Sequence, residues 1–363
     1  MASAVVSETA KDMTGESGIA PIVQQHYNSL ENGGLEERKQ SRIFHMRNFN
    51  NWVKSMLIRD FINKRKEAKC DDGTFTVLDL GAGKGGDLLK WKKGGITYLV
   101  CADIAGTSLQ HAEERYRELR ERHQRQREWG RMFEAEFIEA DCTKERLAAR
   151  YVRGEGMQFD LVSCQFTLHY SFESLPQAKC MLRNASECLV PGGFFIGTTP
   201  DAYDLVHRVR QSDGLGFGNN VFSVTFATKE EFPLFGAKYD FHLEGVVDCP
   251  EFLVHMDVLQ ELASEYGLHL VYKKRFETFF DEFRQDREGK MLLRKMRALE
   301  EYPPARYCTA MGKDPDEYEH AIQTMERLKA EVKDPDARTR VGTLSKAEWE
   351  ALSIYVVFAF QKR

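Results

Sequence analysis

The feature that most constrains the fold of this chain is the segment at residues 76–87, which reads TVLDLGAGKGGD. Residues 76–80 are mostly apolar and predict a short strand, and residues 88–91 predict the start of a helix. The glycines between them permit a tight turn and let a ligand approach without a Cβ in the way. A helix N-terminus adds unpaired N–H groups and a partial positive charge. The segment therefore predicts a nucleotide-binding turn.

Two kinds of protein use such a turn. A dinucleotide-binding Rossmann domain has the pattern G-x-G-x-x-G, which residues 81–86 match. A methyltransferase that uses S-adenosylmethionine (SAM) has D-x-G-x-G-x-G, which residues 79–85 match. Asp79 favours the second, because a carboxylate beneath the turn would repel a pyrophosphate but attract the ammonium and sulfonium groups of SAM.

Acidic residues also end the next predicted strands. Asp103 follows a strand predicted at residues 97–102, and Asp141 ends one predicted at residues 137–141. Asp103 lies 22 residues after Gly81, near the spacing of a ribose-binding acid. A single such acid is most often a solvated loop residue. Successive acids at strand ends favour a ligand site, because ligands of open parallel sheets bind outside the carboxyl ends of the strands.

Composition excludes several classes of protein. The chain has 363 residues, enough for one large α/β domain with insertions or for two domains. It contains no apolar run long enough to span a membrane. None of its eight cysteines forms a C-x-x-C pair, which argues against zinc, and we expect no metal. The net charge of −5 argues against a non-specific grip on long nucleic acid, although a local basic pocket remains compatible with it.

The order of predicted elements gives the fold class. Strands and helices alternate from about residue 75 to about residue 200, and an apolar strand at 354–360 ends the chain. We therefore expect an α/β, Rossmann-like class I SAM-dependent methyltransferase fold. Its sheet should be mostly parallel and seven-stranded, with an antiparallel last strand. We expect a disordered tail at residues 1–22 and one catalytic domain at residues 23–363. Two insertions are expected: a pair of strands at about 205–250, followed by a helix at 250–266, and a helical segment at about 277–350.

The chain further resembles the eukaryotic mRNA cap (guanine-N7) methyltransferases, from about residue 40 to residue 363. The motifs that carry the resemblance are NFNNW at 48–52, LHYSFES at 168–174, LEGVVD at 243–248 and PEFLV at 250–254. The chain departs from the family pattern at Ala82, where a cysteine is common, and in a small insertion at 124–132. The resemblance implies transfer of a methyl group from SAM to N7 of the cap guanosine, with S-adenosylhomocysteine as the second product.

The resemblance also implies roles for individual residues. SAM would be bound by Lys54, Asp79, Gly81, Gly83, Asp103, Asp141, Gln165 and Tyr170. The cap would be bound by Asn50, Asn51, Lys84, Lys90, Arg115, His169, Glu244 and Tyr355. Of these, His169, Glu244 and Tyr355 would position the guanine. Glu244 is expected late in the second inserted strand among apolar neighbours, where it would accept hydrogen bonds from guanine N1–H and the exocyclic amine. Three of these residues also have a purely structural interpretation. His169 and Tyr355 could be core residues, and Asn50 could cap a helix.

The implied chemistry needs no acid–base residue. Guanine N7 has a lone pair and no proton, so it can attack the methyl group directly when the reacting atoms are held in line. The resemblance implies the 5′ cap of nascent mRNA as partner, together with the capping machinery, RNA polymerase II or a small activating subunit, and a nuclear location. Three other hypotheses remain: a SAM methyltransferase acting on another substrate, an inactive methyltransferase-like binding module, and an NAD-dependent oxidoreductase.

Overall fold

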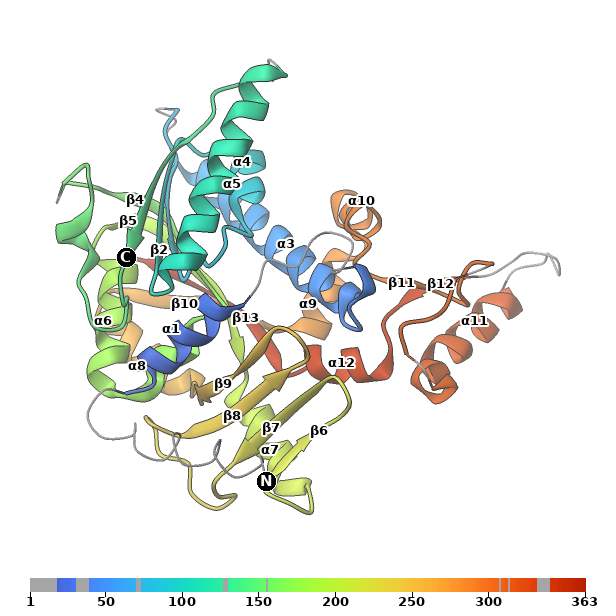
Figure 1. Cartoon of the computed structure of the whole chain (residues 1–363). Coiled ribbons are helices and arrows are strands. Elements are labelled where there is room, and N and C mark those ends of the chain that lie inside the picture. The colour runs from blue at the N-terminus through green and yellow to red at the C-terminus, as the bar shows by residue number, and fades with distance from the viewer. Residues whose placement is uncertain are drawn as a thin grey trace, which may run out of the picture.

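A seven-stranded sheet forms the centre of the molecule (Figure 1). The computed structural model describes residues 18–30, 39–69, 73–126, 130–154, 156–306, 308–312, 314–331 and 340–363. The strands of this sheet are β1 Thr76–Leu80, β2 Tyr98–Asp103, β3 Glu134–Glu139, β4 Phe159–Gln165, β5 Leu189–Pro200, β10 Leu268–Arg275 and β13 Tyr355–Lys362. Their order is β10-β13-β5-β4-β1-β2-β3, and β13 runs antiparallel to both of its neighbours. The predicted fold class is confirmed.

Helices bury both faces of this sheet. Neighbouring residues of β1 point to opposite sides, so Val77 belongs to one apolar core and Leu78 to the other. The first core is covered by α3 Phe44–Ala68, α4 Leu88–Gly94 and α5 Gly106–Arg125. The second is covered by α6 Leu175–Ser186, α8 Met256–Ser264 and the short 3₁₀ helix η1 Leu147–Arg150. Burial on both faces explains why the central strands read as nearly continuous apolar runs.

Helix α3 connects the core to the glycine turn. Its apolar residues recur at helical spacing, and Phe49, Trp52, Val53 and Met56 are fully buried. The indole of Trp52 donates a hydrogen bond to the carbonyl of Gly289 at 3.0 Å, which ties α3 to the C-terminal insertion. With this face fixed in the core, the polar flank of α3 is turned toward the start of α4.

The first insertion is a four-stranded antiparallel sheet rather than the predicted pair of strands. It contains β6 Gly216–Gly218, β7 Phe222–Phe226, β8 Lys238–Leu243 and β9 Val247–Phe252, in that order, after α7 Ala202–Gln211. The helix predicted from residue 250 is wrong at its start, because Pro250 pairs with Asp240 inside β9 and α8 begins only at Met256. Strand β9 lies at the sheet edge, the position where a strand tolerates proline.

The second insertion is mostly helical. It contains α9 Phe276–Phe283, α10 Arg287–Met296, β11 Glu300–Tyr302, η3 Pro315–Tyr318, α11 Glu319–Glu331, β12 Val341–Thr343 and α12 Lys346–Leu352. Strands β11 and β12 pair with each other and, with α11, extend away from the central sheet (Figure 1). The N-terminus of α12 is fixed by reciprocal hydrogen bonds between Ser345 and Glu348.

The N-terminal helix α1 spans Ala20–Ser29. It begins inside the segment expected to be a disordered tail, and residues 1–17 of that segment lie outside the described residues. Pro21 at its first turn suits a helix start. Within the described residues, no helix has the length and apolar character of a membrane span.

Candidate active site

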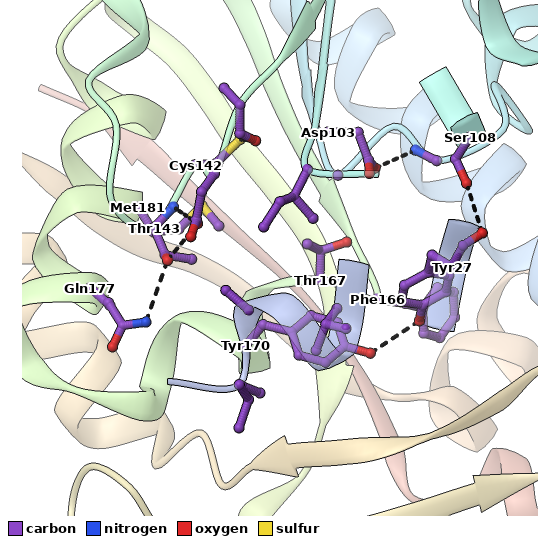
Figure 2. Close-up of a pocket in the computed structure, with 18 of the residues that line it drawn as sticks. Tyr27, Asp103, Ser108, Cys142, Thr143, Phe166, Thr167, Tyr170, Gln177 and Met181 are labelled. Carbon is purple, nitrogen blue, oxygen red and sulfur yellow. Dashed lines mark hydrogen bonds between the residues drawn. The ribbon is translucent and has the colours of Figure 1, made fainter. Parts of the chain in front are cut away.

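A cavity of about 230 Å³ opens at the carboxyl ends of the central strands (Figure 2). Six of the eight predicted cofactor residues line it: Gly81, Gly83, Asp103, Asp141, Gln165 and Tyr170. They come from the ends of β1, β2 and β4, from the segment after β3, and from the 3₁₀ helix η2 Leu168–Glu173. The sheet topology therefore brings together residues that are far apart in the sequence, at the place where open parallel sheets bind ligands.

The glycine turn and Asp103 support each other. Gly81 and Gly83 have φ of +72° and +52°, a conformation that side chains disfavour, and a Cβ at Gly83 would meet no atom within 4 Å. Asp103 accepts hydrogen bonds from the backbone N–H of Gly83 at 2.7 Å and of Ala105 at 2.8 Å. Burial raises the pKa of Asp103, and these two N–H groups oppose the change. The result is a backbone cradle that faces open space beside a buried carboxyl.

Gln165 lines the same cavity and has an unused hydrogen-bond acceptor. Its Nε2 donates to the hydroxyl of Ser163 at 3.2 Å, whereas its buried Oε1 has no hydrogen-bond partner among the described residues. A buried polar atom without a partner costs free energy, so a bound donor at this place would be stabilising. The orphaned amide oxygen, the glycine cradle and the strand-end carboxylates fit an adenosine-containing cation such as SAM.

Lys54 and Asp79 are not among the residues that line the cavity. Lys54 forms an ion pair with Asp87 at 2.9 Å, and Asp79 accepts a hydrogen bond from the indole of Trp91 at 3.2 Å. Burial, together with the charge of Asp87, raises the pKa of Asp79 to about 7. A nearby cation would favour the ionised form of Asp79. Direct contact of Lys54 and Asp79 with SAM stays a prediction.

Helix α1 covers the cavity, and the sequence reading missed this role. Tyr27 and Tyr170 point toward each other across it, with their hydroxyls 3.0 Å apart (Figure 2). Ser108 donates to the Tyr27 carbonyl at 3.3 Å, and Gln24 donates to the carbonyl of Ile104 at 2.9 Å. These contacts span more than 70 residues of sequence, so no local pattern could have predicted them.

Tyr27→Phe should weaken SAM binding by roughly 2- to 10-fold, because it removes one buried hydrogen bond and keeps the ring, a loss of about 0.5–1.5 kcal/mol. Isothermal titration calorimetry measures the effect. Tyr203→Phe is the matched control, since the exposed Tyr203 also loses one hydrogen bond, to Asp257, but lies outside the cavity. Equal effects of the two substitutions would show that Tyr27 has no special contact with the cofactor.

A buried polar cluster adjoins the cavity on the other side of η2. His169 and Glu251 are only 2% and 3% exposed, and His169 Nε2 lies 3.3 Å from Glu251 Oε1. Tyr239 donates to the other carboxylate oxygen of Glu251 at 2.7 Å. Neither ring nitrogen of His169 has a hydrogen-bond partner of good geometry among the described residues. Tyr355 is buried as well, and this burial together with the charge of Glu251 raises its pKa.

The expected position of Glu244 is wrong. Glu244 is exposed in the turn between β8 and β9, and β8 ends one residue earlier, at Leu243. Tyr239, which donates a hydrogen bond to Glu251, lies roughly 13 Å from Leu243, the last residue of β8, at the usual rise per residue. Glu251, which the sequence reading missed, is the buried carboxylate next to His169. No clean alternation marks Glu251, because Phe252, Leu253 and Val254 after it are buried as well.

The predicted cap-binding residues Lys84, Lys90 and Arg115 surround the glycine turn. Arg115 donates to the carbonyl of Lys84 at 2.8 Å, and Lys90 donates to the side-chain oxygen of Asn51 at 3.1 Å. The buried Oδ1 of Asn50 has no hydrogen-bond partner among the described residues. Burial and the charge of Arg115 lower the pKa of Lys84. Such mutual repulsion favours an anionic ligand at this place.

No group of three or more potential metal-binding side chains occurs in the described ranges.

The strand order, the glycine turn and the acids at strand ends define a class I SAM-dependent methyltransferase. The family described as the mRNA (guanine-N(7))-methyltransferase domain matches residues 10–363, and the chain belongs to this family. The predicted resemblance is therefore confirmed.

Named relatives agree with this family. The chain is 45% identical to the mRNA cap guanine-N(7) methyltransferase of Drosophila melanogaster, over 94% of this chain and 77% of that protein. It is 37% identical to mRNA cap guanine-N(7) methyltransferase 1 of Oryza sativa subsp. japonica, over 96% of this chain and 83% of that protein. Among solved structures, a SAM-dependent methyltransferase from Clostridium acetobutylicum is 11% identical with a TM-score of 0.45, covering 86% of this chain and 92% of that chain.

Proposed function

We propose that this protein transfers the methyl group of SAM to N7 of the 5′-terminal guanosine cap of mRNA, converting GpppN to m7GpppN and releasing S-adenosylhomocysteine. One observation carries the proposal. Tyr170 lines the cofactor cavity, and its neighbour His169 faces the buried carboxylate of Glu251. Two consecutive residues of η2 thus connect a SAM-type cavity to a polar cluster suited to a purine edge.

The cofactor residues hold SAM, which when bound supplies an electrophilic methyl group. Gly81, Gly83, Asp103, Asp141 and Gln165 would contact it from the strand ends. Tyr27 and Tyr170 close the cavity and exclude water. Lys54 and Asp79 act from beneath the glycine turn, where Lys54 is fixed by its ion pair with Asp87.

The cap residues hold the acceptor base. The carboxylate of Glu251 would accept hydrogen bonds from guanine N1–H and the exocyclic amine, a pair of donors that adenine lacks. The base becomes cationic as the new bond forms, and a fixed carboxylate stabilises that charge. His169 and Tyr355 would fix the plane of the base, and Asn50, Asn51, Lys84, Lys90 and Arg115 would bind the phosphates. No side chain needs to move a proton.

The pH dependence should appear in KM and not in kcat. Burial lowers the pKa of Lys90 to about 8. The positive charge of Lys54 adds to this effect, and the negative charge of Asp87 opposes it. A phosphate prefers the protonated lysine, so cap binding above this pH must take up a proton. KM for GpppN should therefore rise above about pH 8, by at most tenfold per pH unit for one proton.

Steady-state kinetics with the cap dinucleotide test this expectation. The rate constant kcat should stay flat between about pH 6 and pH 8, because N7 needs no general base. Lys90→Arg should abolish the rise in KM, since arginine stays charged throughout this range. A steep limb in single-turnover rates near neutral pH, assigned to a side chain, would contradict the mechanism.

The activity is tested by incubating the protein with SAM and GpppG-capped RNA and mapping the methylated atom by digestion and mass spectrometry. Methyl at N7 of the cap guanine is the expected result, and ApppG-capped RNA is the matched control that should not react. A thermal-shift comparison of SAM, S-adenosylhomocysteine and NAD accompanies it. Stabilisation by SAM without methyl transfer would support the inactive binding module, and stabilisation by NAD alone would support the oxidoreductase.

The wider setting also belongs to this proposal. We propose that the chain from the start of α1, residues 20–363, acts as one catalytic domain, and that the protein works in the nucleus with the capping machinery, RNA polymerase II or a small activating subunit. The family membership supports this setting, because capping acts on nascent transcripts. Imaging of the tagged full chain, together with co-purification of polymerase, tests it. A purely cytoplasmic signal without polymerase would contradict it.

A further inference from the structure

A second, wider hollow of about 770 Å³ lies between α3, α4 and α10, and we call it the basic groove. Seven lysine or arginine residues and a single glutamate line it. The chain as a whole carries the opposite balance, with 51 basic and 56 acidic residues. The local excess of positive charge is therefore a property of this groove and not of the surface in general.

Four of these cations have no carboxylate partner in the part of the chain that the structure describes. Arg59 is neutralised by Asp286 and Glu288, each at 2.9 Å. By contrast, Lys66, Lys93, Lys295 and Arg297 form no ion pair within the described residues, and all four are exposed. Lys66 donates to the carbonyl of Gly94, and Arg297 lies over the ring of Phe44. Their positive charge is thus available to an anionic ligand.

The basic groove starts at the proposed cap site. Asn51 and Lys90, which are bonded to each other, line the groove and are also expected to bind the cap. From there the lining follows one flank of α3 through Ser55 and on to Lys66. The distance along the helix from Asn51 to Lys66 is about 22 Å at the usual rise per residue. An anionic chain leaving the cap phosphates can therefore continue along a positively charged path.

The groove offers little that could read bases. Its neutral polar lining consists of amides and hydroxyls such as Asn48 and Ser55, and its one aromatic residue, Phe44, is 8% exposed and covered by Arg297. Grooves that hold bases present exposed aromatic faces for stacking. Contacts from lysine, arginine and amide groups go mainly to phosphate and sugar, which carry no sequence information.

We propose that the basic groove binds the sugar–phosphate backbone of the transcript immediately 3′ of the cap, without sequence preference. This inference rests on the proposed cap methyltransferase activity. An RNA strand fits better than an acidic peptide because the groove is continuous with the residues expected to hold the cap triphosphate. Capped RNA should therefore bind to the protein more tightly than the cap dinucleotide alone.

The test compares the double variant Lys93→Ala/Lys295→Ala with the wild type on two substrates, the dinucleotide GpppG and a GpppG-capped RNA of about 20 nucleotides, longer than typical single-strand sites. For the wild type, KM should be lower for the capped RNA. For the variant, KM for capped RNA should rise about 10-fold, and the slope of log KM against log salt should fall by about 1.4 for two lost phosphate contacts. Kinetics with GpppG should not change.

Lys290→Ala is the matched control, because Lys290 lies on α10, as Lys295 does, but lines a different hollow. It should leave KM for both substrates unchanged. Three outcomes would each contradict RNA binding by the basic groove. The wild type could have equal KM values for GpppG and capped RNA, or the double variant could lose equally on both substrates. Polyglutamate could also compete while RNA length has no effect. If the wild type methylates neither GpppG nor capped RNA, the proposed function itself fails, and this outcome is distinct from the others.

Discussion

Asp103→Ala is expected to weaken SAM binding by about 10- to 150-fold, corresponding to the loss of a charge-assisted hydrogen bond of about 1.5–3 kcal/mol. The carboxylate lies at the end of β2 in the cofactor cavity, where it can hold ribose hydroxyls. It also accepts hydrogen bonds from the N–H groups of Gly83 and Ala105. Its loss therefore removes a ligand contact and loosens the turn that shapes the cavity.

Calorimetric titration with SAM and with a cap analogue measures the two affinities separately. Binding of the cap analogue should change much less than binding of SAM, because all the proposed cap residues except Lys84, which lies in the glycine turn, lie on η2, α3, α4, α5, β9 and β13. Asp103→Asn is the second variant, since it keeps the shape and a hydrogen-bond acceptor. Equal losses of both ligands, together with a lower melting temperature, would mean that Asp103 is structural and not a SAM contact.

Local patterns predicted the centre of the site well. The strand, turn and helix at residues 76–91 were predicted because glycine conformation and strand composition act over a few neighbouring residues. The antiparallel direction of the last strand, β13, was also predicted correctly. The positions of Asp103, Asp141 and Gln165 then follow from topology alone, because parallel strands end at the same edge of a sheet.

Contacts between distant segments were not predictable in this way. The covering role of α1 depends on Tyr27 meeting Tyr170, which is 143 residues away. The guanine-binding carboxylate was assigned to Glu244 from the family resemblance, and residues 250–266 were separately predicted to form a helix. Pro250 suits the first turn of a helix as well as an edge strand, and only the pairing of β8 with β9 separates the two. Once β9 is a strand, Glu251 becomes a buried carboxylate that needs a partner.

Glu251→Gln should reduce kcat/KM for methyl transfer to GpppG-capped RNA by about 10²- to 10³-fold, the usual cost of removing a fixed group that stabilises transition-state charge. The amide keeps the shape of the side chain, can still accept from Tyr239, and is easier to bury than a charge. Folding and SAM affinity should therefore stay close to those of the wild type. The loss should come from the missing negative charge beside the cationic base, and from an amide N–H that faces the guanine donors.

Glu244→Gln is the matched control for this experiment, because it makes the same chemical change in the same hairpin. Glu244 is exposed in the β8–β9 turn, whereas Glu251 lies against His169 and Tyr239. Single-turnover methyl transfer, calorimetry with SAM and thermal melting should be measured on both variants. We expect a large loss of transfer in Glu251→Gln and nearly normal transfer in Glu244→Gln. The reverse pattern would restore Glu244 as the guanine-binding carboxylate, and normal transfer in both variants would remove the guanine pocket from this side of η2.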